Sequence, residues 1–193
     1  MTDVDEGKKA TERMINSQRA LCLAASAWAM TLGGGQAEEA WGLESAGIGT
    51  GFSATRINEH FRQLIAFTRF DTPWSAKISH ECRLHTTVDV SAGTLAHDGY
   101  FGFVGSFGPV FTLSKQRFPI EVAIGVSPTV LSRQRFGNVD FGIPFQFTSH
   151  GGFNFLLSDK WVANYRFQHM SNAGLSRHNT GLSLHSLSVA YRF

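Results

Sequence analysis

The sequence predicts an all-β protein: an eight-stranded antiparallel transmembrane β-barrel preceded by a cleaved signal peptide. Three observations predict this fold class, namely an apolar leader, a succession of strand-like segments after it, and an aromatic residue at the C-terminus. The 193 residues include 17 Phe, 20 Gly and only 5 Pro, which suits Gly-rich aromatic strands better than a helical bundle. A formal net charge of +2 gives no indication of nucleic-acid binding.

Residues 1–37 are the predicted N-terminal extension and signal peptide. A short polar stretch from Met14 precedes an apolar run over residues 20–32, and three glycines then lead to the small residue Ala37. This order is typical of a secretory leader, with translation starting at Met14 and cleavage after Ala37. A transmembrane anchor is the weaker alternative because the run is too short to span hydrocarbon comfortably. Cys22 does not indicate a lipoprotein, since it lies near the start of the run rather than after it.

The exported part, residues 38–193, is the predicted barrel. It retains one cysteine, Cys82, so an internal disulfide is excluded. Its strand-like segments number eight, the even count that a small outer-membrane barrel needs. They are predicted, in order, at residues 46–55, 61–70, 83–92, 100–113, 118–130, 141–157, 161–171 and 185–193.

The last segment shows the alternation most clearly. Leu187, Val189, Tyr191 and Phe193 share one face, and small or polar residues occupy the other. A closed barrel in lipid requires this apolar-out pattern, and a terminal aromatic residue resembles the C-terminal signal of bacterial outer-membrane proteins. A soluble periplasmic sandwich or a lipocalin-like barrel, in which a core strand simply ends in Phe, is the alternative.

The connections are expected to alternate in length. Tight turns at residues 114–116 and 158–160 suit the periplasmic side, whereas longer links at 93–99, 131–140 and 172–184 suit the outer side. The link over residues 71–82, which contains Pro73, is predicted to be long on the periplasmic side and so departs from this rule.

The seventh segment carries the candidate chemistry. Tyr165 and Phe167 share its apolar face, and by the same parity His169 and Ser171 lie on that face too. A histidine and a serine two residues apart on one side of a strand form a candidate base and nucleophile. Polar groups that face lipid cost several kcal/mol unless they find a partner. The alternative is that both side chains are satisfied by a neighbouring loop.

At these residues the sequence resembles the lipid A 3-O-deacylases, the PagL family of outer-membrane barrels. The matching stretch runs over residues 166–174, Arg-Phe-Gln-His-Met-Ser-Asn-Ala-Gly, and is followed by Asn179, Gly181 and the closing residues 191–193. Weaker agreement extends back through residues 145–150. The His-x-Ser-Asn block at a strand end is the specific part of the match.

The resemblance implies a role for each site residue. Ser171 corresponds to the nucleophile and His169 to the general base, while Asn172 and the Gly174 backbone lie near the oxyanion and Asn179 supports the site. The family's carboxylate, two positions after Gly181, is replaced here by Ser183. A serine can fix the histidine tautomer but cannot stabilise imidazolium by charge.

Other side chains could replace the missing carboxylate only in part. His178 and His185 are near Ser183 in the sequence but supply no negative charge. Glu121 or Asp140 could act as a displaced acid only if the fold brings it close to His169.

The function that follows is an outer-membrane esterase that removes the 3-O-linked acyl chain of lipid A, with its site at the outer leaflet of a Gram-negative outer membrane. The expected partners are lipid A (lipopolysaccharide) and outer-membrane lipids, with no nucleic acid. Both a monomer and a homodimer remain open. No cofactor or metal is expected, since the histidines lack ligand spacing. The main alternative is a non-catalytic structural or adhesive barrel; a transport barrel is disfavoured because side chains fill an eight-stranded interior.

Overall fold

The structure is a computed structural model that describes residues 41–54 and 60–193. The predicted leader, its start at Met14 and its cleavage site after Ala37 lie outside the described residues and stay predictions, as does the boundary of the barrel domain at residue 38. In the described part, no helix is long and apolar enough to cross a membrane.

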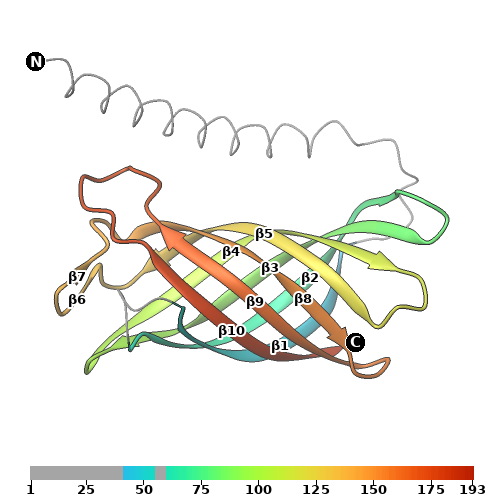
Figure 1. Cartoon of the computed structure of the whole chain (residues 1–193), viewed down its shortest axis with the longest axis horizontal. Coiled ribbons are helices and arrows are strands. Elements are labelled where there is room, and N and C mark those ends of the chain that lie inside the picture. Colours follow the sequence, from blue (N-terminus) through green and yellow to red (C-terminus); the bar gives the residue numbers. More distant parts are fainter. Residues whose placement is uncertain (1–40, 55–59) are drawn as a thin grey trace, which may run out of the picture. The chain divides into compact units, whose positions relative to one another are not determined.

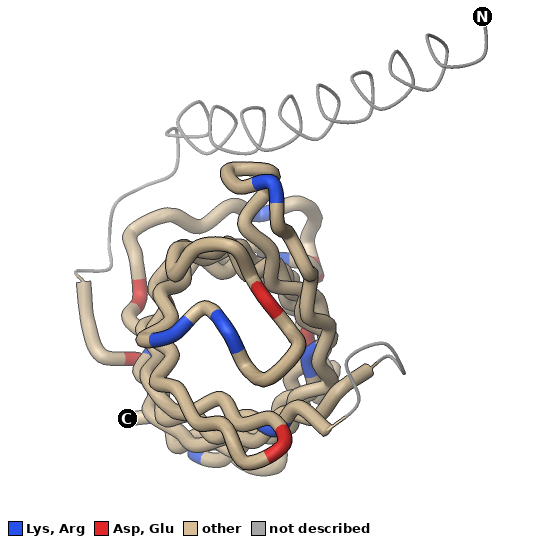
Figure 2. Tube along the Cα trace, turned by 90° about the vertical axis from the view of Figure 1, so that its left-hand side faces the viewer, with Lys and Arg blue, Asp and Glu red and all other residues tan. Residues whose placement is uncertain are grey.

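Eight strands close into an antiparallel barrel in the order β1-β10-β9-β8-β5-β4-β3-β2, and a separate hairpin pairs β6 with β7. Figure 1 shows the barrel from the side, and Figure 2 shows it end-on as a closed ring with a segment lying across the opening. The predicted eight-stranded antiparallel barrel is therefore confirmed. The strands are β1 Gly42–Ser53, β2 Arg62–Lys77, β3 Cys82–His97, β4 Tyr100–Lys115, β5 Ile120–Leu131, β6 Arg135–Phe136, β7 Val139–Asp140, β8 Phe145–Leu156, β9 Trp161–Ser171 and β10 Leu182–Arg192.

The predicted lengths of two links between strands are wrong. Residues 71–82 are not a long loop, because β2 continues to Lys77 and a short turn leads to Cys82. The strand passes Pro73 through an irregularity in the pairing between Asp71 and Ser75, which is where a residue without an N–H is tolerated in a sheet. All links at this end, the end of the C-terminus, are thus short.

The second wrong link is the long outer loop predicted at residues 93–99. Here β3 continues to His97 and joins β4 through Asp98 and Gly99 alone. Both residues have positive φ, 46° and 82°, as a tight hairpin turn requires. The loops at the outer end that remain long are residues 132–144, which include the β6–β7 hairpin, and residues 172–181.

The lumen is filled, and its inner part is held by paired charges. Arg69 Nε on the adjacent strand β2 donates to Asp89 Oδ1 at 2.8 Å, and Arg166 Nη2 on the non-adjacent strand β9 donates to Asp89 Oδ2 at 3.0 Å. Arg192 contacts Glu121 at 3.4 Å. Because each buried charge has an opposite partner, the network ties non-neighbouring strands together across the lumen.

The outer part of the lumen is apolar instead. Phe136 in β6 and Phe141 just after β7 are fully buried and pack edge-on against each other, with ring centroids 6.0 Å apart. They close the barrel mouth together with residues from the strand ends. The buried members of this cluster are Phe61, Leu95, Val104, Leu131, Phe136, Phe141, Met170, Leu182 and Leu184.

The outer surface of the barrel carries a broad apolar band. Along every long strand, every second side chain points outward, and many of these are large and hydrophobic. Together they form the surface that lipid covers. Aromatic pairs mark the edge of the band at the end of the barrel that carries the C-terminus. The ring centroids of Trp41 and Trp74 are 6.2 Å apart, and those of Trp161 and Tyr191 are 5.3 Å apart. Exposed members of the band include Ile48, Leu64, Phe103, Phe107, Ile124, Phe153, Phe167 and Leu187.

Candidate active site

Strand β9 presents its His-x-Ser pair outward, as its sequence parity predicts. Val162, Asn164 and Met170 point into the lumen and are buried, whereas Phe167 is 44% exposed on the other face. His169 and Ser171 lie on the face of Phe167, at the outer end of the strand. They therefore stand on the wall of the barrel and not inside it.

Strand β10 supplies the partner of the histidine. Ser183 pairs directly with His169 in the β9–β10 ladder and also points outward. Its Oγ lies 3.0 Å from His169 Nδ1. Ser183 thus occupies the position from which a carboxylate would orient the ring, and it does so with a neutral hydroxyl.

The second ring nitrogen of His169 lies next to Gly181. A Cβ at Gly181 would stand 2.7 Å from Cε1 and 3.1 Å from Nε2 of the ring, so any larger residue would displace the imidazole. Sequence reasoning gave Gly181 no role of its own, because its closeness to His169 arises only when β10 pairs with β9. Nδ1 is thus engaged by Ser183, and in the described part of the chain no hydrogen bond joins His169 to Ser171, whose backbone positions are about 6.8 Å apart along the strand.

Asn172 ends β9 by turning inward. It is fully buried, and its Nδ2 donates to the carbonyls of Phe141 (3.0 Å) and His178 (2.7 Å). Its Oδ1 accepts the N–H of Gly174 at 3.0 Å. In this arrangement the polar groups of Asn172 and the Gly174 N–H are committed to the loop. Their predicted place near the oxyanion stays a prediction.

Asn179 has a free donor beside the site. Its Oδ1 accepts the backbone N–H of Asn172 at 3.0 Å, which fixes the amide plane. Among the described residues, its NH₂ group has no hydrogen-bond partner, and the side chain is exposed. An exposed, oriented amide donor next to a nucleophile is suited to binding an oxyanion.

Neither carboxylate considered as a displaced acid bonds to His169. Glu121 is buried in the lumen, where its Oε2 accepts from Asn154 and Arg192. Asp140 binds Arg135 through Oδ2 at 2.6 Å and the Gly142 N–H through Oδ1 at 2.8 Å. These two hydrogen bonds, that from Arg135 first, hold the pKa of Asp140 below its usual range.

An aromatic and histidine patch continues from the site down the same wall. The Tyr165 hydroxyl lies 2.9 Å from His185 Nδ1, and the His185 ring lies 5.6 Å from Phe52 and 5.5 Å from Phe167. This aromatic wall patch (Phe52, Tyr165, Phe167 and His185) spans β1, β9 and β10. Sequence reasoning missed it because its members come from three strands.

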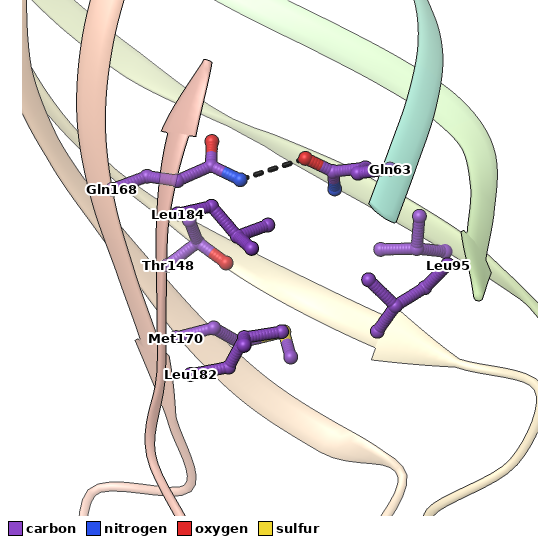
Figure 3. Close-up of a pocket in the computed structure, with 8 residues that line it drawn as sticks. Gln63, Leu95, Thr148, Gln168, Met170, Leu182 and Leu184 are labelled. Carbon is purple, nitrogen blue, oxygen red and sulfur yellow. Dashed lines mark hydrogen bonds between the residues drawn. The ribbon is translucent and has the colours of Figure 1, made fainter. Parts of the chain in front are cut away.

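The lumen contains a cavity near the outer end of β9. It lies between Gln63 and Gln168, whose amides are joined by a 2.7 Å hydrogen bond, and the apolar cluster near Leu95 and Met170 (Figure 3). The cavity is small, with room for about one water molecule.

Comparisons with known proteins point to one family. The family described as lipid A 3-O-deacylase (PagL) matches residues 62–192. A lipid A deacylase PagL of Bordetella bronchiseptica (strain ATCC BAA-588 / NCTC 13252 / RB50) is 32% identical over 143 residues, or 71% of this chain and 79% of the relative. The crystal structure of the outer membrane enzyme PagL superposes with a TM-score of 0.65 at 21% identity, covering 76% of this chain and 97% of that one.

Proposed function

This chain belongs to the lipid A 3-O-deacylase (PagL) family of outer-membrane ester hydrolases, and from that premise we propose that Ser171 and His169 hydrolyse the 3-O-linked acyl ester of lipid A on the lipid-facing wall of the barrel. The observation that carries the proposal is the outward hydrogen bond between His169 Nδ1 and Ser183 Oγ. It leaves Nε2 for a serine on the same face, at the edge of the outer leaflet.

The substrate reaches this site without leaving the membrane. Lipid A lies in the outer leaflet with its acyl chains in hydrocarbon, so an ester near its sugar lies at the level of the outer strand ends. The acyl chain to be removed then runs down the wall along the aromatic wall patch. Apolar contact with Phe52 and Phe167 replaces contact with neighbouring lipid, and a site open to the bilayer is what such a substrate needs.

The reaction follows the logic of a serine hydrolase. His169 Nε2 takes the Ser171 Oγ proton as the oxygen attacks the ester carbonyl, and the amide of Asn179 donates to the oxyanion. The sugar oxygen leaves with the proton from His169, giving an acyl-serine. Water then attacks this ester with His169 as base again, which releases the fatty acid and restores Ser171.

The neutral partner of the histidine limits the rate. When His169 is protonated, Ser183 can accept its Nδ1–H and keep the ring in place, but contributes no negative charge. We therefore expect a competent but slower site than one with a carboxylate at residue 183.

The test uses purified, folded barrel in detergent with lipid A, and counts acyl chains by mass spectrometry. Ser171→Ala and His169→Asn should each abolish release, and the double variant should be no worse than either, because both residues serve the same step. Ser188→Ala is the matched control: the residue is on β10, but its Oγ binds Asn164 away from the site, so release should persist.

Two results would contradict the proposal. Continued release by folded Ser171→Ala would place the chemistry elsewhere. A wild-type barrel that releases no chain from any lipid A offered would leave the non-catalytic structural or adhesive barrel as the better account.

A further inference from the structure

The residue after the nucleophile is held by a distant loop. Asn172 has local partners in its own turn, namely Gly174, His178 and Asn179, but its bond to the Phe141 carbonyl spans 31 residues. This turn is conformationally demanding, since Ala173 and Gly174 have positive φ values of 52° and 81°. The long-range bond fixes the position at which the turn begins. It therefore also fixes the position of Ser171, the last residue of β9.

The Phe141 carbonyl is itself fixed from β8 by Gln146. Gln146 is fully buried, and its Nε2 donates to the carbonyls of Phe141 (3.3 Å) and Ile143 (2.5 Å). The Phe141 N–H donates to Gln134 at 2.9 Å, and its ring is locked in the apolar cluster. Both the backbone and the side chain of Phe141 are therefore immobilised on the barrel mouth.

The next residue of this loop touches the turn directly. Gly142 has a φ of 80°, and a Cβ there would overlap the His178 carbonyl and stand 2.7 Å from Ser176 Oγ. Its N–H is held by Asp140, which is paired with Arg135 on β6. The foot of the β6–β7 hairpin and the turn after Ser171 are therefore in close contact, with no space for an added methyl group.

We propose that Gln146 is a positioning residue for the nucleophile: through the Phe141 carbonyl and Asn172, it sets the distance between Ser171 Oγ and His169 Nε2. The inference rests on the function proposed above. Gln146 touches neither reacting group, but proton transfer needs heavy atoms within about 2.6–3.2 Å. A shift of about 1 Å in such a pair can cost on the order of 10²-fold in rate.

The test replaces Gln146 by Met, which keeps the length of the side chain and removes the donor. Folded Gln146→Met should lose about 10- to 100-fold in kcat on lipid A, with KM within about twofold of wild type. The rate at which a fluorophosphonate labels Ser171 should fall in parallel, since labelling also needs the His169 pair but not lipid A binding. A merely structural role would change the fraction folded and leave both rates, per folded barrel, unchanged.

Thr148→Val is the matched control. Thr148 is two residues further along β8 and also faces the lumen. Its hydroxyl forms a 2.8 Å hydrogen bond with Thr129, and the valine variant loses this bond, which has no connection to Asn172. Its kcat and labelling rate should match wild type. If Gln146→Met folds and keeps both wild-type rates, the inference is wrong.

A second variant keeps the test decisive if Gln146→Met does not fold. Gly142→Ala acts from the loop and should cause the same selective loss of kcat; wild-type kcat in folded Gly142→Ala would overturn the inference, as would failure of both variants to assemble. Failure of the proposed function looks different: wild-type protein would then release no acyl chain, and Ser171 would not be labelled.

Discussion

At the scale of single residues, the proposed site has Ser183 at the position where a serine triad has its carboxylate. Ser183 meets His169 Nδ1 at 3.0 Å but is neutral. Its geometry is that of an orienting residue, and the missing element is charge. The transition state carries a positive imidazolium, so a nearby carboxylate would stabilise that state more than the resting one.

Ser183→Glu is therefore expected to raise the rate of acyl release. The gain should be on the order of 10²–10⁴-fold, which is what loss of the acid costs in serine triads. Deacylated lipid A per unit of folded protein is the measurement. Ser183→Gln, of the same shape without the charge, is the control and should gain little. A Glu variant no faster than the Gln variant would show that charge at this position is not limiting.

The sequence predicted the orientation of a site residue only where the alternation along a strand determines whether its side chain points outward or into the lumen. His169 and Ser171 follow the alternation of Tyr165 and Phe167, so their outward position could be derived. The inward turn of Asn172 could not, because it depends on the carbonyl of Phe141, 31 residues away. The contact between Gly181 and His169 likewise depends on the register of β10 against β9.

At the scale of elements, β10 closes the barrel by pairing with β1. The ladder ends with the Phe193 N–H donating to Glu44 O at 3.0 Å, and the Phe193 ring lies 5.5 Å from Tyr191. The ring is 72% exposed on the lipid-facing side. The last residue thus adds little burial within the barrel and is available for recognition during assembly.

Deletion of Phe193 should impair insertion into the outer membrane while export across the inner membrane continues. The measurement is the fraction of heat-modifiable folded barrel in outer-membrane preparations. Phe193→Tyr, which keeps an aromatic end and the same backbone bond, should assemble normally. Wild-type levels of folded barrel after the deletion would show that the terminal aromatic residue is dispensable.

The lengths of two links between strands were predicted wrongly, for different reasons. The Asp98-Gly99 turn has a strong local signal, since both residues suit the positive φ of a tight hairpin, and the predicted long loop there overlooked it. Continuation of β2 past Pro73 has no such signal. It depends on pairing of Ser75 with His85 on β3, a contact that the local sequence does not specify.

At the scale of the whole molecule, paired charges inside the lumen connect strands across the barrel. Asp89 on β3 joins Arg69 on β2 to Arg166 on β9, across the lumen. The sequence predicted a filled eight-stranded barrel from strand count and alternation. It could not predict that Arg166 meets Asp89, because β9 and β3 are not adjacent in the barrel.

Asp89→Asn should destabilise the barrel by about 3–5 kcal/mol, because it leaves two buried guanidinium groups without their shared carboxylate. The measurement is urea unfolding in phospholipid vesicles, followed by tryptophan fluorescence. Glu81→Gln is the control: it removes an exposed pair with Lys115 at 3.2 Å and should cost at most about 1 kcal/mol. Equal stability of the two variants would mean that the lumen network contributes no more than a surface pair.

The most direct test of catalysis on the lipid-facing wall is the mass spectrum of lipid A from intact Gram-negative cells that lack other deacylases. Cells expressing the wild-type barrel should yield lipid A lighter by the 3-O-linked acyl chain, and cells with equal amounts of folded Ser171→Ala should yield unmodified lipid A. Unmodified lipid A in both strains, or loss of the chain in both, would contradict the account.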